Sequence, residues 1–246
     1  MASRSHNRRQ VAFYERTATR YDRSVWSLGC RDNRNHQTKI RAIARAIGAE
    51  AGGSVLEVGV GTGLHARWLL DNTPVTHAGV DLSAPMLEIA RERLSGQGAR
   101  SALGIADALR LPFDDERFDA AFCVGTLHHL PDAAGGIAEL ARVVKRGGRV
   151  AALEPNWKFP SVLVYSAITP EERNTFKINP DRLLSWGRRA GLTELRVQRL
   201  LYTPPRPASW AQAFDRIDAT LARTPGLRNL SINLLLSGLR AEPPIA

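Results

Sequence analysis

The sequence predicts an α/β fold in which a doubly wound, mostly parallel sheet carries helices on both faces. From residue 38 onward, short apolar runs alternate with amphipathic stretches, and this alternation is typical of βα units stacked on a parallel sheet. The chain has 246 residues, of which 43% are hydrophobic, so it can bury a large core. The same composition excludes a disordered or a collagen-like chain.

Seven strands are expected, at residues 54–58, 76–80, 101–105, 120–124, 149–154, 193–201 and 230–238. Helical patterns occupy residues 38–49, 62–71, 84–95, 133–144, 180–190 and 209–223. Between residues 155 and 178, Pro155, Pro160 and Pro170 indicate an irregular stretch. In an open sheet of this kind, the ligand crevice lies at the carboxyl ends of the strands.

The net charge of +10 is unevenly distributed along the chain. Residues 1–41 carry +7 and residues 196–246 carry +4, whereas residues 42–195 carry −1. A strongly basic chain suggests nucleic acid or an anionic membrane as partner. Because the central part is almost neutral, whatever it binds is not recruited by bulk positive charge.

Sequence features that would place the chain in a membrane or an oxidising compartment are missing. Two cysteines, Cys30 and Cys123, are too few for a disulfide framework. The first ten residues are polar and basic without a following apolar region, and no run approaches the roughly 18–20 apolar residues of a membrane span. We therefore expect a soluble, cytoplasmic protein; the oligomeric state, monomer or homodimer, stays open.

The most informative segment is an apolar strand followed by Gly59, Gly61 and Gly63 and then by a helix. Glycines there let the backbone turn sharply and let a ligand approach the N–H groups of the helix start. A dinucleotide-binding loop of the form G-x-G-x-x-G/A would need glycine or alanine at the position of Leu64. A nucleotide-linked oxidoreductase is therefore the weaker interpretation.

Three acidic residues follow three expected strands. Glu57, Asp81 and Asp107 lie at or just after the ends of the first, second and third strands, so we expect all three to face one crevice. Carboxylates would repel a pyrophosphate but suit a ligand with a cationic centre and an amino group. An acidic residue at the position of Asp81 commonly binds a ribose diol.

With these residues, the chain resembles the class I S-adenosylmethionine-dependent methyltransferases, especially the branch of the ubiquinone/menaquinone-biosynthesis enzymes. The matching segments are residues 55–63, 79–83 with Met86, 107–119, 127–130 and 139–148. One departure is Arg146, where the family usually has proline. The resemblance implies a Rossmann-like sheet of seven strands with one antiparallel strand near the C-terminus, and methyl transfer with S-adenosyl-L-methionine as cofactor.

The resemblance also implies a cofactor site that runs from the glycine loop across the strand ends. Its predicted residues are Glu57, Gly59, Gly61, Thr62, Gly63, Asp81, Leu82, Met86, Asp107, Ala108, Val124 and Gly125. The glycines would admit the methionine part, with Glu57 near its amino end, and Asp81 would hold both ribose hydroxyls. The next four residues would surround the adenine, and the last two would line the sulfonium side.

Catalysis of methyl transfer needs orientation, desolvation and, for some acceptors, a base, but no covalent nucleophile. The base candidates are His128 and His129 after the fourth strand, together with Tyr14 and Tyr21 from an N-terminal segment that in the family often folds over the cofactor. Packing at a helix start is the alternative role of the two histidines. No metal site is expected, because adjacent helical side chains diverge by about 100° and no third ligand is spaced nearby.

The domain organisation expected is a basic tail and lid helix at residues 1–37 and one methyltransferase domain at residues 38–246. The N-terminal residues 1–37 and insertions at about residues 155–178 and 202–228 should form the acceptor pocket; they are apolar and aromatic, with arginines interspersed. We expect a small or medium organic acceptor, methylated on O, N or C, such as a secondary metabolite, a quinone precursor or a lipid-linked intermediate. If the positive charge has a function, it favours an anionic acceptor.

Two alternatives to a small-molecule methyltransferase stay open. An RNA methyltransferase is weakened because Val124, Gly125, Thr126 and Leu127 stand where enzymes that methylate base amino groups carry an Asn/Asp-Pro-Pro-aromatic motif. The Pro-Cys dipeptide of cytosine-C5 enzymes is also missing. The second alternative is a non-catalytic methyltransferase-like protein that binds the cofactor as a sensor or serves as a partner subunit.

Overall fold

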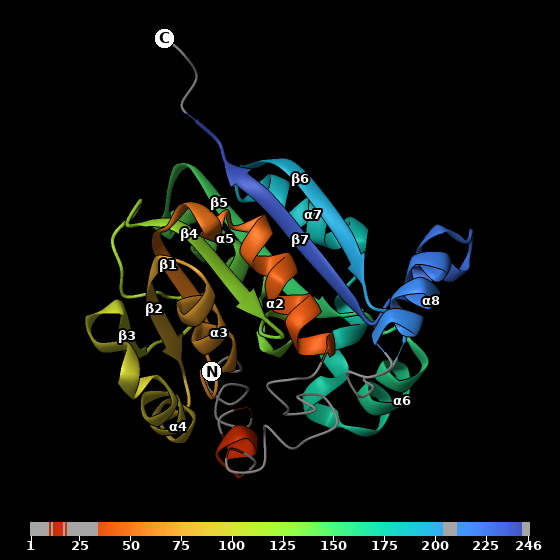
Figure 1. Ribbon diagram of the computed structural model, residues 1–246, viewed down its shortest axis with the longest axis horizontal. Coiled ribbons are helices and arrows are strands. Elements are labelled where there is room, and N and C mark those ends of the chain that lie inside the picture. The colour runs from red at the N-terminus through yellow and green to blue at the C-terminus, as the bar shows by residue number, and fades with distance from the viewer. Residues whose placement is uncertain (1–9, 11, 17, 19–33, 204–210, 243–246) are drawn as a thin grey trace.

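The computed structural model describes residues 10, 12–16, 18, 34–203 and 211–242 (Figure 1). Its sheet has the strand order β3-β2-β1-β4-β5-β7-β6. The strands are β1 (Gly53–Val58), β2 (Val75–Asp81), β3 (Ser101–Ile105), β4 (Phe118–Val124), β5 (Val144–Pro155), β6 (Leu192–Leu200) and β7 (Asn233–Arg240). Strands β1 to β5 pair in parallel, and β7 runs antiparallel to both β5 and β6. The predicted seven-stranded, mostly parallel sheet is confirmed.

Helices cover both faces of the sheet, as the apolar character of its central strands requires. They are α2 (Arg34–Ala46), α3 (Leu64–Asn72), α4 (Ala84–Leu94), α5 (Ala133–Val143), α6 (Pro160–Ile168), α7 (Pro180–Arg189) and α8 (Ala211–Arg223). Ile137 of α5 and Leu183 of α7 are buried against one face. Ile40 of α2 and Leu69 of α3 are buried against the other. Figure 1 shows α2 across the near face, with α5 and α7 behind the sheet.

The stretch at residues 155–178 is more regular than predicted. It contains α6 and the 3-10 segment η4 (Pro170–Lys177). Pro160 and Pro170 both stand in the first turn of their helices, where the missing N–H costs no hydrogen bond and the fixed φ suits the helix. The prediction of an irregular stretch was wrong because these prolines start helices instead of interrupting them.

Other predicted boundaries differ by a few residues. The leading helix begins at Arg34 instead of residue 38, and β7 begins at Asn233 because the 3-10 segment η6 (Leu227–Leu230) precedes it. Residues 10, 12–16 and 18 are helical, in line with the predicted lid helix. The rest of residues 1–33, including Tyr21 and Cys30, lies outside the described residues. In the part of the chain that the structure describes, no helix is long and apolar enough to cross a membrane.

Strand β5 bulges near its start, and this bulge depends on Gly148. The β4–β5 register changes from Phe118 opposite Val144 to Ala120 opposite Arg149, so the extra residues of β5 bulge out of the ladder. A Cβ on Gly148 would lie 2.6 Å from the carbonyl oxygen of Asp119 and 2.8 Å from that of Lys145. The sequence needs glycine here because backbone atoms, which cannot rotate away, surround the position.

We predict that Gly148→Ala lowers the free energy of unfolding by about 1–3 kcal/mol, because the added methyl group forces the β4 and β5 backbones apart. The matched control is Gly104→Ala on the edge strand β3, where a Cβ would meet nothing within 4 Å. This control should change stability by less than about 0.5 kcal/mol. Urea unfolding followed by tryptophan fluorescence measures both, and equal losses would contradict the packing role of Gly148.

Candidate active site

A cleft of about 800 Å³, open to solvent, lies at the carboxyl ends of β1, β2 and β4. The residues that line the cleft are Gln10, Tyr14, Val58, Gly59, Gly61, Asp81, Leu82, Ser83, Met86, Ala106, Asp107, Ala108, Val124, Gly125, Thr126, His129 and Leu130. The crevice predicted from the strand order is therefore present.

The glycine loop between β1 and α3 forms one wall. The N–H groups of Gly59 and Val60 both donate to the carbonyl of Val80, which folds the loop over the end of β2. Gly59, Gly61 and Gly63 have φ values of 75°, 53° and 76°, a region that favours glycine. A Cβ on Gly59 would collide with Thr126, whereas one on Gly61 would meet no atom within 4 Å. Gly61 therefore presents bare backbone to the open cleft.

Asp81 stands at the end of β2 and points into the cleft. Its two carboxylate oxygens accept hydrogen bonds from the N–H groups of Gly61, at 2.8 Å, and Ser83, at 2.9 Å. Burial raises the pKa of Asp81, and these hydrogen bonds act against the rise. Asp107 also lines the cleft and accepts from the N–H of Leu109 at 2.9 Å. Two carboxylates thus face the ligand space, which favours a ligand with positive charge.

Glu57 corrects one prediction, because it does not line the cleft. Its side chain is fully buried beneath the loop, with its carboxylate 3.2 Å from His77 Nε2 and 3.6 Å from His65 Nδ1. Burial acts to raise the pKa of Glu57, but the hydrogen bonds and charges of the two histidines outweigh it and lower the pKa. The side chain of a strand residue points to one face of the sheet, and here that face is the interior.

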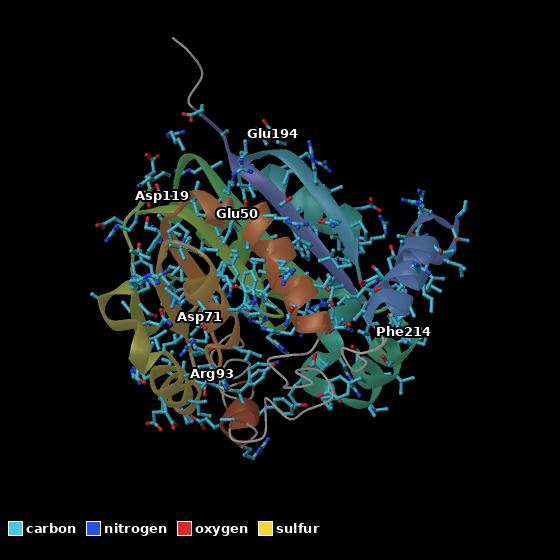
Figure 2. All side chains as sticks on the ribbon, viewed as in Figure 1. Glu50, Asp71, Arg93, Asp119, Glu194 and Phe214 are labelled. Carbon is cyan, nitrogen blue, oxygen red and sulfur yellow. The ribbon has the colours of Figure 1, made fainter. Side chains whose placement is uncertain are left out.

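Two further predicted residues support the loop from behind. Thr62 is buried, and its carbonyl and hydroxyl oxygens accept from Arg93 Nη1 at 2.6 and 2.8 Å. A Cβ on Gly63 would lie 3.1 Å from Ala90 Cβ, so this glycine allows α3 to approach α4. Figure 2 shows Arg93 at the cleft end of the sheet, opposite the end that carries Asp119. The other predicted cofactor residues, from Leu82 to Gly125, line the cleft as expected.

The segment after β4 is held by a buried carboxylate that the sequence interpretation missed. Glu154, near the end of β5, accepts hydrogen bonds from the N–H groups of Thr126, Leu127 and His128, at 3.0, 2.9 and 3.2 Å. It also lies 2.6 Å from His128 Nδ1. This carboxylate therefore fixes the 3-10 turn η3 (Leu127–His129), which carries both predicted histidines.

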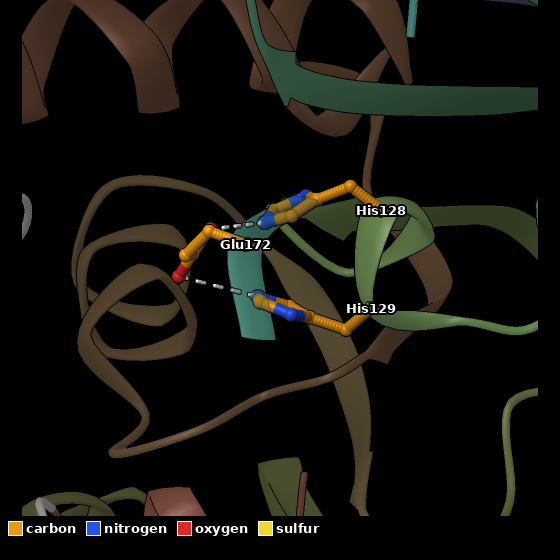
Figure 3. Close-up of side chains that lie close together, drawn as sticks. All are labelled: His128, His129 and Glu172. Carbon is orange, nitrogen blue, oxygen red and sulfur yellow. Dashed lines mark hydrogen bonds and ion pairs between the residues drawn. The ribbon is translucent and has the colours of Figure 1, made fainter. Parts of the chain in front are cut away.

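His128 lies between two carboxylates. Its Nδ1 faces Glu154, and its Nε2 lies 3.1 Å from Glu172 Oε2 (Figure 3). Burial alone would lower the pKa of His128, but the charges and hydrogen bonds of Glu154 and Glu172 outweigh burial and raise it to about 10. An imidazole that donates to a carboxylate through each nitrogen carries both protons. His128 is thus a cation and cannot serve as the base that the sequence suggested.

His129 lines the cleft instead. Its Nε2 is 2.5 Å from the hydroxyl oxygen of Tyr14 and 4.0 Å from Glu172 Oε1. Tyr14 belongs to the N-terminal helical segment, and Gln10 of the same segment donates from Nε2 to the carbonyl of Glu171 at 3.1 Å. The N-terminal segment is therefore fastened at two points beside the cleft. Tyr21, the other predicted base, lies outside the described residues.

The two histidines and Glu172 form a compact group, which the sequence analysis did not expect. The imidazole rings lie 3.9 Å apart at 45°, and one atom of each of the three side chains falls within 4.8 Å of the others. The expectation of diverging side chains with no third ligand nearby was therefore wrong. Metal binding, however, needs a lone pair on each ligating nitrogen, and carboxylate oxygens of Glu154 and Glu172 already lie 2.6 and 3.1 Å from the two nitrogens of His128.

Glu154 and Glu172 differ in how far the sequence could have revealed them. Glu154 ends an apolar strand, as Asp81 does, so the rule that found Asp81 applies to it equally. Glu172 lies in η4, 44 residues after His128, in a segment without a recognisable pattern. No sequence signal pointed to Glu172.

Residues 56–152 match the protein-family model of a methyltransferase domain. The demethylmenaquinone methyltransferase of Roseiflexus castenholzii is 33% identical over 223 residues, which are 83% of this chain and 86% of that enzyme. The methyltransferase GfsG of Streptomyces halstedii is 40% identical over 103 residues, 41% of this chain. The chain spans only 37% of that relative and about half of several others.

Solved structures show the same fold. A SAM-dependent methyltransferase from Thermotoga maritima aligns with a TM-score of 0.66 and 23% identity, over 92% of this chain and 98% of that one. A geranyl diphosphate C-methyltransferase from Streptomyces coelicolor aligns with a TM-score of 0.62 and 17% identity, over 84% and 79% of the two chains. Together with the similarity to the Roseiflexus enzyme over most of both chains, these matches show that the chain belongs to the class I S-adenosylmethionine-dependent methyltransferases.

Proposed function

We propose that this methyltransferase acts on a small or medium organic acceptor that loses a proton as it is methylated on O, N or C. The observation that carries the proposal is the Tyr14–His129 pair, which lies in the same cleft as Asp81 and Asp107. A proton-accepting pair is useful only when the acceptor must be deprotonated. Relatives and structural neighbours include a demethylmenaquinone methyltransferase, a geranyl diphosphate C-methyltransferase and a phosphoethanolamine N-methyltransferase, whose acceptors are of this kind.

The residues of the cleft fit S-adenosylmethionine. The open space at Gly61 accommodates close approach of a ligand to the backbone. Asp81 would hold the ribose hydroxyls, and Leu82 and Met86 would flank the adenine, with Asp107 and Ala108 at its edge. Val124 and Gly125 would line the sulfonium side. When bound, the cofactor supplies a methyl group on a positively charged sulfur, an activated donor.

The chain's own residues then orient the acceptor and accept its proton. Val124, Leu130 and the glycine backbone line the cleft between β1 and β4 and present apolar surface to the acceptor. His129 Nε2 is placed to accept a proton directly or through the Tyr14 hydroxyl, which is 2.5 Å away. His128 cannot take this role, because carboxylates occupy both of its nitrogens.

The alternatives receive less support from the cleft. Its described lining contains no lysine or arginine, the side chains that would neutralise an RNA backbone. An anionic acceptor therefore rests only on the charge of residues 1–41 and 196–246. A non-catalytic cofactor-binding role would leave the partly buried Tyr14–His129–Glu172 arrangement without a purpose.

The proposed reaction is tested by incubating the protein with methyl-labelled S-adenosylmethionine and a cell extract, and by profiling labelled metabolites with mass spectrometry. Label in a small molecule supports the proposal and identifies the acceptor. Label on RNA alone would contradict it, and the absence of any labelled product with intact cofactor binding would favour the non-catalytic alternative.

For the cofactor site, we predict that Asp81→Ala weakens binding of S-adenosylhomocysteine by about 1.5–3 kcal/mol, or roughly 10- to 150-fold, because hydrogen bonds to a charged group are lost. Isothermal titration calorimetry measures this, with Asp71→Ala on α3 as control, since Asp71 bonds Arg67 at the surface. An unchanged affinity would refute the ribose role. Tighter binding of NAD or NADP would instead support an oxidoreductase.

For the base, we predict that His129→Gln lowers kcat about 100- to 10,000-fold with the acceptor identified by profiling. Glutamine can still bond to Tyr14 but cannot take up a proton. Tyr14→Phe should lower kcat about tenfold. Tyr202→Phe serves as the matched tyrosine control, because the Tyr202 hydroxyl donates to the carbonyl of Arg228 and Tyr202 does not line the cleft. If His129→Gln retains full kcat, the acceptor needs no base from this pair.

A further inference from the structure

We propose that Glu172 is a positioning residue, which holds His129 and Tyr14 in place and stabilises the positive charge that His129 takes up with the acceptor's proton. The proposal deepens the function proposed above and rests on His129 acting as the base. The arrangement that supports it runs from Glu154 in β5 through His128 to Glu172 in η4 and then to His129 (Figure 3).

The first step is that Glu154 takes up Nδ1 of His128, so that Nε2 is the nitrogen left to interact with Glu172. Glu154 is fully buried, so its charge requires compensation. Three backbone N–H groups and His128 Nδ1 provide it. The other nitrogen of His128 then donates its proton to Glu172 Oε2 at 3.1 Å and fixes the carboxylate plane of Glu172.

The second step is that the other carboxylate oxygen of Glu172, Oε1, faces His129, the proposed base. Oε1 lies 4.0 Å from His129 Nε2, and only 14% of the Glu172 side chain is exposed. Figure 3 shows the two imidazoles, one above the other, directed at the two oxygens of this one carboxylate. In such a dry environment, a charge at this distance acts more strongly than it would in water.

The third step is the charge balance around His129. Glu154 and Glu172 are negative and His128 is positive, so the group carries one net negative charge before His129 is protonated. Protonation of His129 neutralises the group. Among the described residues, the other titratable groups near His129 or Glu172 are Tyr14, Tyr165 and the adjacent Glu171, and Asp81 and Asp107 line the same cleft as His129. Both cleft carboxylates act in the same direction as Glu172.

The fourth step is that η4 also positions the partner of the base. The backbone carbonyl of Glu171 accepts from Gln10, one turn before Tyr14 in the N-terminal segment. Adjacent residues of η4 therefore hold both members of the pair, Glu172 through its side chain and Glu171 through its backbone. This gives a matched control, since Glu171→Gln removes a neighbouring carboxylate but keeps the contact to Gln10.

The test is an NMR titration of the histidine Cε1–H signals in the full chain saturated with S-adenosylhomocysteine. The His129 signal is assigned by its loss in His129→Gln. In Glu172→Gln the pKa of His129 should fall by about one unit, because a nearby negative charge is removed. In Glu171→Gln it should move by less than about 0.3 unit, and Glu172→Asp should restore most of the wild-type value.

A second variant, His128→Gln, should shift the pKa of His129 in the opposite direction. His128→Gln removes the cation beside His129 and should raise the pKa of His129, which also keeps the proposal testable if Glu172→Gln does not fold. An unchanged His129 pKa in folded Glu172→Gln would overturn the proposal, as would equal shifts in the Glu171 and Glu172 variants. Because the titration needs no acceptor, it can fail or succeed independently of the proposed methyl transfer.

Discussion

The buried carboxylate of Glu154 is the constraint on which the acceptor side of the site depends. A fully buried charge is tolerated only when hydrogen bonds and a counter-charge surround it. Glu154 meets this need with three consecutive N–H groups of residues 126–128 and with His128. The turn η3 therefore has one allowed position against β5. His129 belongs to this turn and lines the cleft, so the position of the turn determines where His129 lies.

The same turn is joined to the cofactor side. The hydroxyl of Thr126 donates to the carbonyl of Val58 at 3.2 Å, and the side chain of Thr126 occupies the space that a Cβ on Gly59 would need. The glycine loop and η3 thus touch, and neither can shift without the other. Methyl transfer requires donor and acceptor to be aligned within a fraction of an ångström. The structure meets this requirement by fixing both walls of the cleft to the ends of adjacent strands, β1 and β4.

The sequence was sufficient for the fold and for most of the residues that line the cleft at the strand ends, because both depend on local patterns. Asp81 and Asp107 follow apolar strands, and parallel strands bring their ends together. Glu57 failed as a cleft residue because strand ends are predictable to within a few residues but the face to which a side chain points is not. Glu172 was unpredictable for another reason: its contact with His128 spans 44 residues and depends on how η4 packs. A helix was predicted in the N-terminal segment, but the hydrogen bonds of Gln10 and Tyr14 beside the cleft could be seen only in the structure.

Electrostatics explains why the proposed base, His129, needs a carboxylate such as Glu172 close to it. A sulfonium cofactor places a positive charge in the cleft that His129 also faces, and a nearby cation disfavours protonation of an imidazole. His128, also a cation and only 3.9 Å away between ring centroids, has the same effect. Without opposing charge, His129 would be a weak base at the moment when it must accept a proton. Glu172 on one side, and Asp81 and Asp107 across the cleft, supply that opposing charge. The nearly neutral centre of a strongly basic chain fits a cationic cofactor and the imidazole base proposed above.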